Sequence, residues 1–127
     1  MNAGYKILVV DDAALVVDRL FDILNEMEVV NELISAHSYQ DAVEKIQQKN
    51  PHFVLLDIQL RGKNGIELLS FIKQQYPEII TIMHTNLVSD YYKDLCNEMG
   101  ANYFIDKSTE FEKVPEIIKA NLFATNK

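Results

Sequence analysis

Five side chains that are able to bind a metal ion or an anion each stand just after a short apolar run of the chain. They are Asp11, Asp12, Asp57, Thr85 and Lys107. If the apolar runs are buried parallel strands, their carboxyl ends meet at one edge of a sheet, and the five side chains are expected to share one small pocket. Three acids, one hydroxyl and one lysine suit the movement of a phosphoryl group between carriers. Catalysis of that kind rests mostly on positioning and charge neutralisation.

The three carboxylates predict a bound cation. Crowded carboxylates repel one another, and their pKa values rise unless a positive charge intervenes. A hard divalent ion with oxygen ligands meets that need, and Mg²⁺ is the expected one because it typically takes one or two carboxylates, phosphate oxygens and several waters. Lys107 would add a point charge for a phosphoryl group, and the hydroxyl of Thr85 would add a hydrogen-bond donor.

Short apolar runs alternate with longer amphipathic runs along the whole chain. The pattern predicts strands at 6–10, 30–36, 53–56, 79–83 and 103–105, and helices at 14–27, 39–49, 66–76, 89–99 and 111–121. Ser38 begins a variant capping box, Gly100 takes the position of a C-cap glycine, and Pro115 makes the last helix effectively begin near Val114. Five alternating pairs predict an α/β fold, a doubly wound parallel sheet with helices on both faces.

Composition bounds the function classes. The length of 127 residues fits one domain spanning 1–127, and 19 acidic against 12 basic residues give a net charge of −7. That sign argues against direct nucleic-acid binding, which needs a cationic face. No apolar run is long enough to span a membrane. The single Cys96 excludes an internal disulfide and fits a reducing compartment, so a cytoplasmic protein is expected.

Five motifs occur in order, each at a predicted strand end or helix start. They are Val9-Val10-Asp11-Asp12, Leu55-Leu56-Asp57-Ile58, Gly65-Ile66-Glu67-Leu68-Leu69, Met83-His84-Thr85-Asn86 and Asp106-Lys107-Ser108. With these motifs the chain resembles a bacterial two-component response-regulator receiver domain over nearly its full length, and it is similar to stand-alone chemotaxis-type regulators. The resemblance implies a flavodoxin-like receiver fold with five helices and the strand order 2-1-3-4-5.

The resemblance also implies a phosphoacceptor and a metal site. Asp57 would take a phosphoryl group from the phosphohistidine of a sensor histidine kinase. Mg²⁺ would be bound directly by Asp12 and mainly through water by Asp11, and Asp57 and the backbone carbonyl of Gln59 would belong to the same metal site. Lys107 would pair with the phosphoryl oxygens.

A two-state switch follows from the same resemblance. Thr85 would move to hydrogen-bond the phosphoryl group, and the ring of Phe104 would turn inward with it. The surface formed by 89–99, 103–105 and 111–121 would then bind an unknown downstream protein or form a homodimer. Such a chain is a signalling protein rather than an enzyme, because it promotes only its own phosphotransfer and dephosphorylation.

Three positions depart from the family pattern. Arg61 stands where the family often has proline, and Asn86 stands where a small residue is usual. The larger Asn86 side chain could narrow the access of water to a phosphoryl group and change the rate of dephosphorylation. Ser108 replaces the common proline after the lysine, which removes a backbone constraint and predicts a looser switch.

Several of these residues also have ordinary structural interpretations. Asp12 alone could cap the helix that follows it, and Phe104 could simply be a core residue. Tyr91 and Tyr92 could contact a partner or be scattered surface residues. His84 should point away from Thr85 by strand alternation and serve packing or surface roles.

Two further residues are expected to lie outside the site. Cys96 is expected to be a small core residue, and Asp106 should face away from the pocket.

Other functions remain open from the residues. The chain could be the receiver fragment of a longer transcription factor or another multidomain regulator. It could be a small-molecule phosphatase of the haloacid-dehalogenase type, although Gln59 stands where that class has a second acid. A flavodoxin-type cofactor binder shares the strand pattern, but Asp11 and Asp12 would repel its phosphate.

Overall fold

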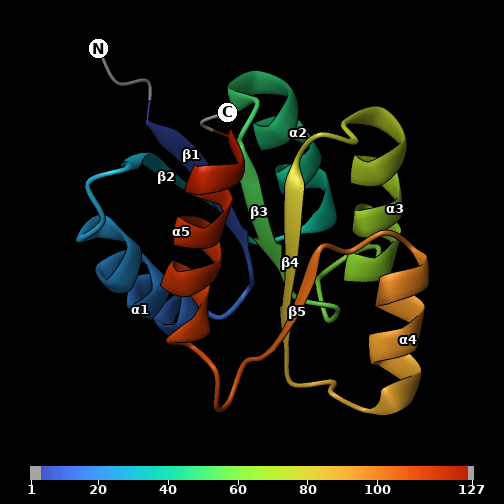
Figure 1. The fold of residues 1–127 in the computed structure, drawn as a ribbon. Coiled ribbons are helices and arrows are strands. Elements are labelled where there is room, and N and C mark those ends of the chain that lie inside the picture. The colour runs from blue at the N-terminus through green and yellow to red at the C-terminus, as the bar shows by residue number, and fades with distance from the viewer. Residues whose placement is uncertain (1–3, 126–127) are drawn as a thin grey trace.

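Five strands and five helices alternate along residues 4–125, the part of the chain that the computed structural model describes (Figure 1). The strands are β1 Tyr5–Val10, β2 Val30–Ala36, β3 Phe53–Leu56, β4 Ile80–Thr85 and β5 Tyr103–Asp106. The helices are α1 Ala14–Asn25, α2 Tyr39–Lys49, α3 Gly65–Gln75, α4 Asp90–Glu98 and α5 Lys113–Thr125. The predicted alternation is confirmed. β4 and β5 run further than expected and include Thr85 and Asp106 at their ends.

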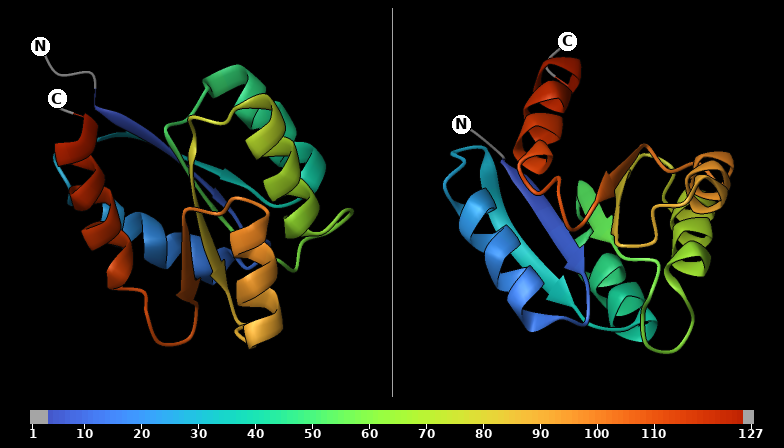
Figure 2. Two further views of the ribbon diagram at one scale, coloured as in Figure 1. Left: turned by 45° about the vertical axis from the view of Figure 1, so that its right-hand side comes forward. Right: turned by 90° about the horizontal axis from the view of Figure 1, so that it is seen from below.

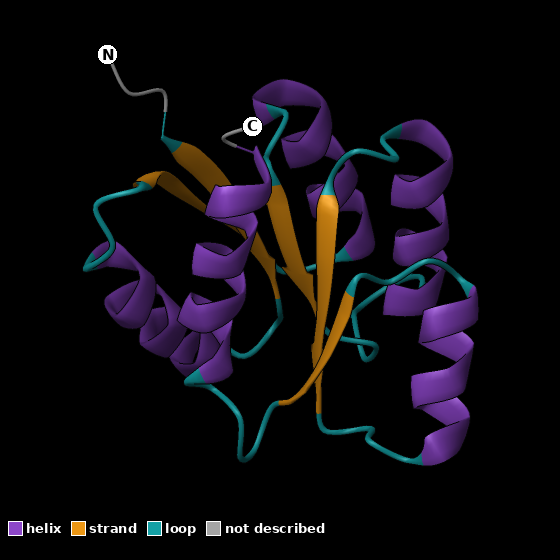
Figure 3. Ribbon diagram, viewed as in Figure 1, coloured by secondary structure: helices purple, strands orange, loops and turns teal. Residues whose placement is uncertain are grey.

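The strands form one parallel sheet in the order β2-β1-β3-β4-β5, with helices on either side of it (Figure 3). This order confirms the doubly wound fold. In the central strands, Ile7–Val10 and Phe53–Leu56 are 0–1% exposed. A strand covered on both faces needs apolar side chains on both faces, which is why these runs show no polar alternation in the sequence.

The sheet separates two apolar clusters. Helices α1 and α5 cover one face, and α2, α3 and α4 cover the other (Figure 2). Alternate residues of each strand therefore belong to different clusters: the α1/α5 side takes Ile7, Val9, Phe53, Leu55 and Ile82, and the other side takes Leu8, Val10, Val54, Leu56 and Met83. Cys96 is fully buried in the second cluster, so its prediction as a small core residue is confirmed.

Helix ends follow the local sequence. The hydroxyl of Ser38 accepts the N–H of Asp41 at 3.1 Å, which confirms Ser38 as the cap of α2. The reciprocal capping box lies at α3 instead, where the side chains and backbones of Asn64 and Glu67 bond each other at 3.0 Å. Gly100, with a φ of +99°, follows the C-cap residue of α4 as predicted.

The last helix begins at Lys113, one residue before the predicted start, and Pro115 is its third residue. Proline is tolerated there because the first turn of a helix has no intrahelical acceptors for its N–H groups. Within residues 4–125 no helix has the length and apolar character needed to cross a lipid bilayer.

Candidate functional site

A buried lysine bridges two buried carboxylates at the carboxyl edge of the sheet. The Nζ atom of Lys107 lies 2.7 Å from Oδ2 of Asp11 and 2.6 Å from Oδ2 of Asp57. The three side chains come from the ends of β1, β3 and β5 and are at most 10% exposed. The parallel sheet therefore brings three of the five predicted polar residues into direct contact.

Backbone amides orient both carboxylates. The N–H of Ala13 donates to Oδ1 of Asp11 at 2.9 Å, and the N–H of Gln59 donates to Oδ1 of Asp57 at 3.2 Å. Each bond closes a turn of the type that aspartate forms with the amide two residues later. One oxygen of each acid is thus fixed by its own loop, which leaves the other oxygen directed at Lys107.

The trio of Asp11, Asp57 and Lys107 is short of positive charge. Burial raises the pKa of Asp11, although hydrogen bonds from Lys107 and Ala13 act in the opposite direction. Burial alone would lower the pKa of Lys107, but the hydrogen bonds and the negative charges of the two acids together outweigh burial and raise that pKa. One ammonium is shared by two carboxylates, so Asp11 is incompletely neutralised while Lys107 stays charged.

Asp12 lies outside the trio. Its side chain is 40% exposed, and its Oδ2 is 4.0 Å from Nε of the exposed Arg61. Both residues line an open cavity of about 390 Å³ that also reaches Asp11. Ala13 is the N-cap residue of α1, and no side chain forms a capping hydrogen bond there, so the interpretation of Asp12 as a helix cap is wrong.

The donor set of this edge suits Mg²⁺ in chemistry. Asp11, Asp12 and Asp57 offer only oxygen atoms, which are the ligands that this ion prefers, and Lys107 neutralises only one of the three charges. Within residues 4–125 no three acidic, imidazole or thiol groups converge closely enough to form a metal centre. The ammonium of Lys107 lies between the two buried acids in this arrangement.

Thr85 is buried, and it contacts Lys107 through the backbone of both residues. The N–H of Lys107 donates to the carbonyl of Thr85 at 2.9 Å, and the Thr85 hydroxyl accepts the N–H of Leu87 at 3.2 Å. Within the described residues, no hydrogen bond joins this hydroxyl to the side chains of Asp57 or Lys107. The hydroxyl is held by the loop that leads into α4.

Phe104 combines the two interpretations that its sequence position allowed. It is half-buried, packs against the apolar cluster on the α2–α4 side, and pairs in register with Met83 on β4. It also lines an opening of about 320 Å³ together with Val88 and Lys93. The ring is thus a core residue with one side at the molecular surface.

The close packing of Gly65 was not evident from the sequence. A Cβ atom at Gly65 would overlap the backbone carbonyl of Asp57 and would lie 2.8 Å from Cα of Ile58. The N–H of Gly65 donates to the carbonyl of Ile58 at 2.7 Å, so the start of α3 is packed directly on the Asp57 loop. An Asn-Gly pair is typical of a turn, but only this close approach of the backbone explains why position 65 needs glycine.

The β5–α5 loop has its own restraint where proline is usual. The carboxylate of Asp106 accepts the N–H of Ser108 at 2.9 Å and its hydroxyl at 2.7 Å. Asp106 is therefore directed away from the trio, as expected, and the hydrogen bonds of Ser108 replace part of the constraint that a proline ring would supply.

His84 makes a contact that connects β4 to α1. It is 2% exposed, and its ring meets Phe111 edge to face with 4.9 Å between centroids. The guanidinium of Arg19 on α1 lies 4.0 Å from the centre of the same Phe111 ring. The packing role predicted for His84 is confirmed. Its Nε2 has no hydrogen-bond partner among the described residues.

Comparisons with known proteins agree with this architecture. The model of the response regulator receiver domain family matches residues 7–119, so the chain belongs to that family, whose members act in phosphorylation-based signalling. A CheY-like receiver domain protein from Methanospirillum hungatei superposes with a TM-score of 0.88 at 27% identity, covering 98% of each chain. The response regulator domain of Thermotoga maritima CheB has a TM-score of 0.82 at 27% identity, also covering 98% of each chain.

One similar structure belongs to a longer protein. RcsB of Salmonella typhimurium superposes with a TM-score of 0.88 over 98% of this chain, but at 18% identity, which shows the fold alone. The present chain spans 62% of that RcsB chain.

Proposed function

We propose that this chain is a phosphorylation-controlled switch in which Asp57 accepts a phosphoryl group from a sensor histidine kinase. The observation that carries the proposal is the buried Asp57 carboxylate, fixed by the Gln59 amide and paired with Lys107 at 2.6 Å. In the reaction, an Asp57 oxygen forms a bond to phosphorus while the bond between phosphorus and the donor imidazole nitrogen breaks. The imidazole leaves, an acyl phosphate forms, and the ammonium of Lys107 offsets charge on the transferred group.

Mg²⁺ bound by Asp11, Asp12, Asp57 and the carbonyl of Gln59 would supply charge stabilisation for the transferred oxygens. The residues themselves support this assignment. Asp11 is incompletely neutralised in the trio, and Asp12 adds a further carboxylate at the open side of the same edge. A divalent cation would balance the charge that Lys107 leaves uncompensated.

The signal would leave through Thr85 and Phe104. Movement of the Thr85 hydroxyl toward an acyl phosphate would break its bond from Leu87, and the next residue, Val88, lines the same opening as Phe104. The Phe104 ring, which has one side at the surface, would then turn inward. The surface of α4, β5 and α5 would then bind a downstream protein or a second copy.

We infer that residues 1–127 act as one cytoplasmic receiver unit. The similarity to the longer RcsB keeps a multidomain regulator as the alternative setting.

Intact-mass measurement with acetyl phosphate and Mg²⁺ tests the phosphoacceptor. We expect an adduct of one phosphoryl group on the wild-type protein, none on Asp57→Asn, and the wild-type adduct on Asp94→Asn, a matched control with an exposed aspartate of α4. A full adduct on Asp57→Asn would overturn the assignment. Steady release of phosphate from a small phosphomonoester, lost in Asp57→Asn, would favour the phosphatase interpretation instead.

A further inference from the structure

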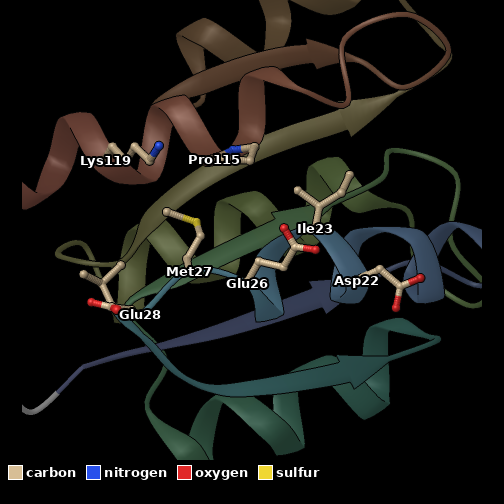
Figure 4. A pocket seen from close by; sticks show the side chains of 8 residues that line it. Asp22, Ile23, Glu26, Met27, Glu28, Pro115 and Lys119 are labelled. Carbon is tan, nitrogen blue, oxygen red and sulfur yellow. The ribbon is translucent and has the colours of Figure 1, made fainter.

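An open groove of about 590 Å³ lies between α1 and α5, on the face of the sheet that these helices cover (Figure 4). Its apolar lining comes from Ile23, Met27, Val29 and Pro115. Met27 points into the space between the two helices, with Pro115 on α5 across from it (Figure 4). The first three side chains are only half-buried, so apolar surface remains accessible within the groove.

The rim of the groove is acidic. Asp22, Glu26 and Glu28 line it with exposed side chains, and Lys119 of α5 is the single cation among the described lining residues. Within residues 4–125 none of the three carboxylates forms an ion pair. Asp18 extends the series along α1, because Asp18, Asp22 and Glu26 follow one another at intervals of four residues.

Helix stability does not explain these acids. Like charges four residues apart repel each other on a helix surface. Glu26 is also the C-cap residue of α1, where the negative end of the helix dipole disfavours a carboxylate, and the last turn contains no basic residue. Charges that oppose the local rules without a compensating contact are expected where a surface serves binding.

We propose that the α1–α5 groove docks a basic amphipathic helix from a partner protein. Aliphatic side chains of that helix would cover Met27 and its apolar neighbours, and flanking lysine or arginine residues would meet the acidic rim. A second copy of this chain is disfavoured, because the described lining has three carboxylates and one lysine, so a symmetric contact through the groove would bring an excess of negative charge together. Nucleic acids and anionic membranes are disfavoured by the same negative charge.

The proposal goes beyond the phosphorylation switch. The groove is lined from the C-terminal part of α1, the turn before β2 and the first half of α5, whereas Asp57 lies at the carboxyl edge of β3. Binding can therefore be measured on unphosphorylated protein without a phosphodonor. Failure of the Asp57 assignment would leave the result unaffected.

The test uses a synthetic amphipathic helix of leucine and lysine as the probe, with a leucine–glutamate helix of the same pattern as its control. NMR chemical-shift changes of the backbone amides in the isotope-labelled full chain would map the contact, and the fluorescence anisotropy of the labelled probe would give Kd. We expect the chemical-shift changes to be confined to the groove. Glu26→Lys should bind the probe about tenfold more weakly than the wild type, and Glu44→Lys should bind it as the wild type does. Glu44 is an exposed acid of α2 on the opposite face, so both variants change the net charge equally.

Two results would overturn the proposal. Equal weakening by Glu26→Lys and Glu44→Lys would show attraction by net charge alone, and so would shifts spread over the surface. Thermal unfolding of the free variants gives a second criterion. Glu26→Lys should be at least as stable as the wild type, because it removes a carboxylate from a helix C-terminus, and a clear loss of stability would show that Glu26 has a structural role instead.

Discussion

Replacing His84 with leucine should remove a pH dependence from the stability of this protein. Burial, assisted by the nearby charge of Lys107, lowers the pKa of His84 from 6.5 to about 4. The imidazole lies at 2% exposure against Phe111, and its Nε2 has no acceptor for an additional proton among the described residues. The folded protein therefore holds this histidine neutral.

The size of the effect follows from proton linkage. Below pH 6.5 the unfolded chain takes up a proton at this position, while the folded protein does so only near pH 4. The unfolded state is therefore favoured progressively as the pH falls through this window, and stability is regained as the pH rises above 6.5. This difference between the folded and unfolded pKa values of His84 lowers the unfolding free energy by roughly 2 kcal/mol between about pH 7 and about pH 5. The total loss at the acid limit is roughly 3 kcal/mol.

Urea unfolding at a series of pH values, followed by circular dichroism, measures this difference. We expect the stability of the wild type to fall relative to His84→Leu as the pH decreases, because other groups titrate equally in both proteins. Parallel profiles for wild type and His84→Leu would refute the argument.

Three further predictions concern the packed interior. Lys107→Met should lower the unfolding free energy by roughly 3 kcal/mol at neutral pH, because two buried acids lose their shared cation. Its stability should recover toward acid pH as Asp11, whose pKa burial raises, takes up a proton, and a urea series would show this. Gly65→Ala should cost about 1–3 kcal/mol, since its Cβ meets backbone. The same change at Gly62 finds open space, but the φ of +80° there still strains an alanine by about 1–2 kcal/mol, so this variant measures backbone strain without steric overlap. The thiol of Cys96, fully buried and with its pKa raised by burial, should react with a disulfide reagent only at the rate of unfolding. Rapid reaction of the folded protein would contradict that placement.

The fold was predictable because its signals are local. The uninterrupted apolar runs of β1 and β3 mark strands covered on both sides, and the helices between them carry one apolar face. The boundaries were less predictable at the strand ends. Thr85 and Asp106 are polar, which ended the expected runs early, yet both pair within the ladder between β4 and β5. Backbone pairing there depends on the neighbouring strand rather than on the side chain.

The contacts within the site were only partly predictable. The meeting of Asp11, Asp57 and Lys107 follows from parallel strands that end at one edge. That Lys107 is shared between the two acids, while Asp12 is exposed beside Arg61, depends on the loops and could not be predicted from spacing. The contact of His84, Phe111 and Arg19 joins residues from three distant segments, and no local pattern announces it.

The two apolar clusters have a consequence for how this sequence can change. Side chains on opposite faces of the sheet belong to separate clusters, as Leu20 of α1 and Leu68 of α3 do. Substitutions at such a pair should add in free energy rather than couple. Each half of the interior can therefore be redesigned or can diverge as a separate packing problem. Among the described residues, it is the backbone of the sheet that must satisfy both halves at once.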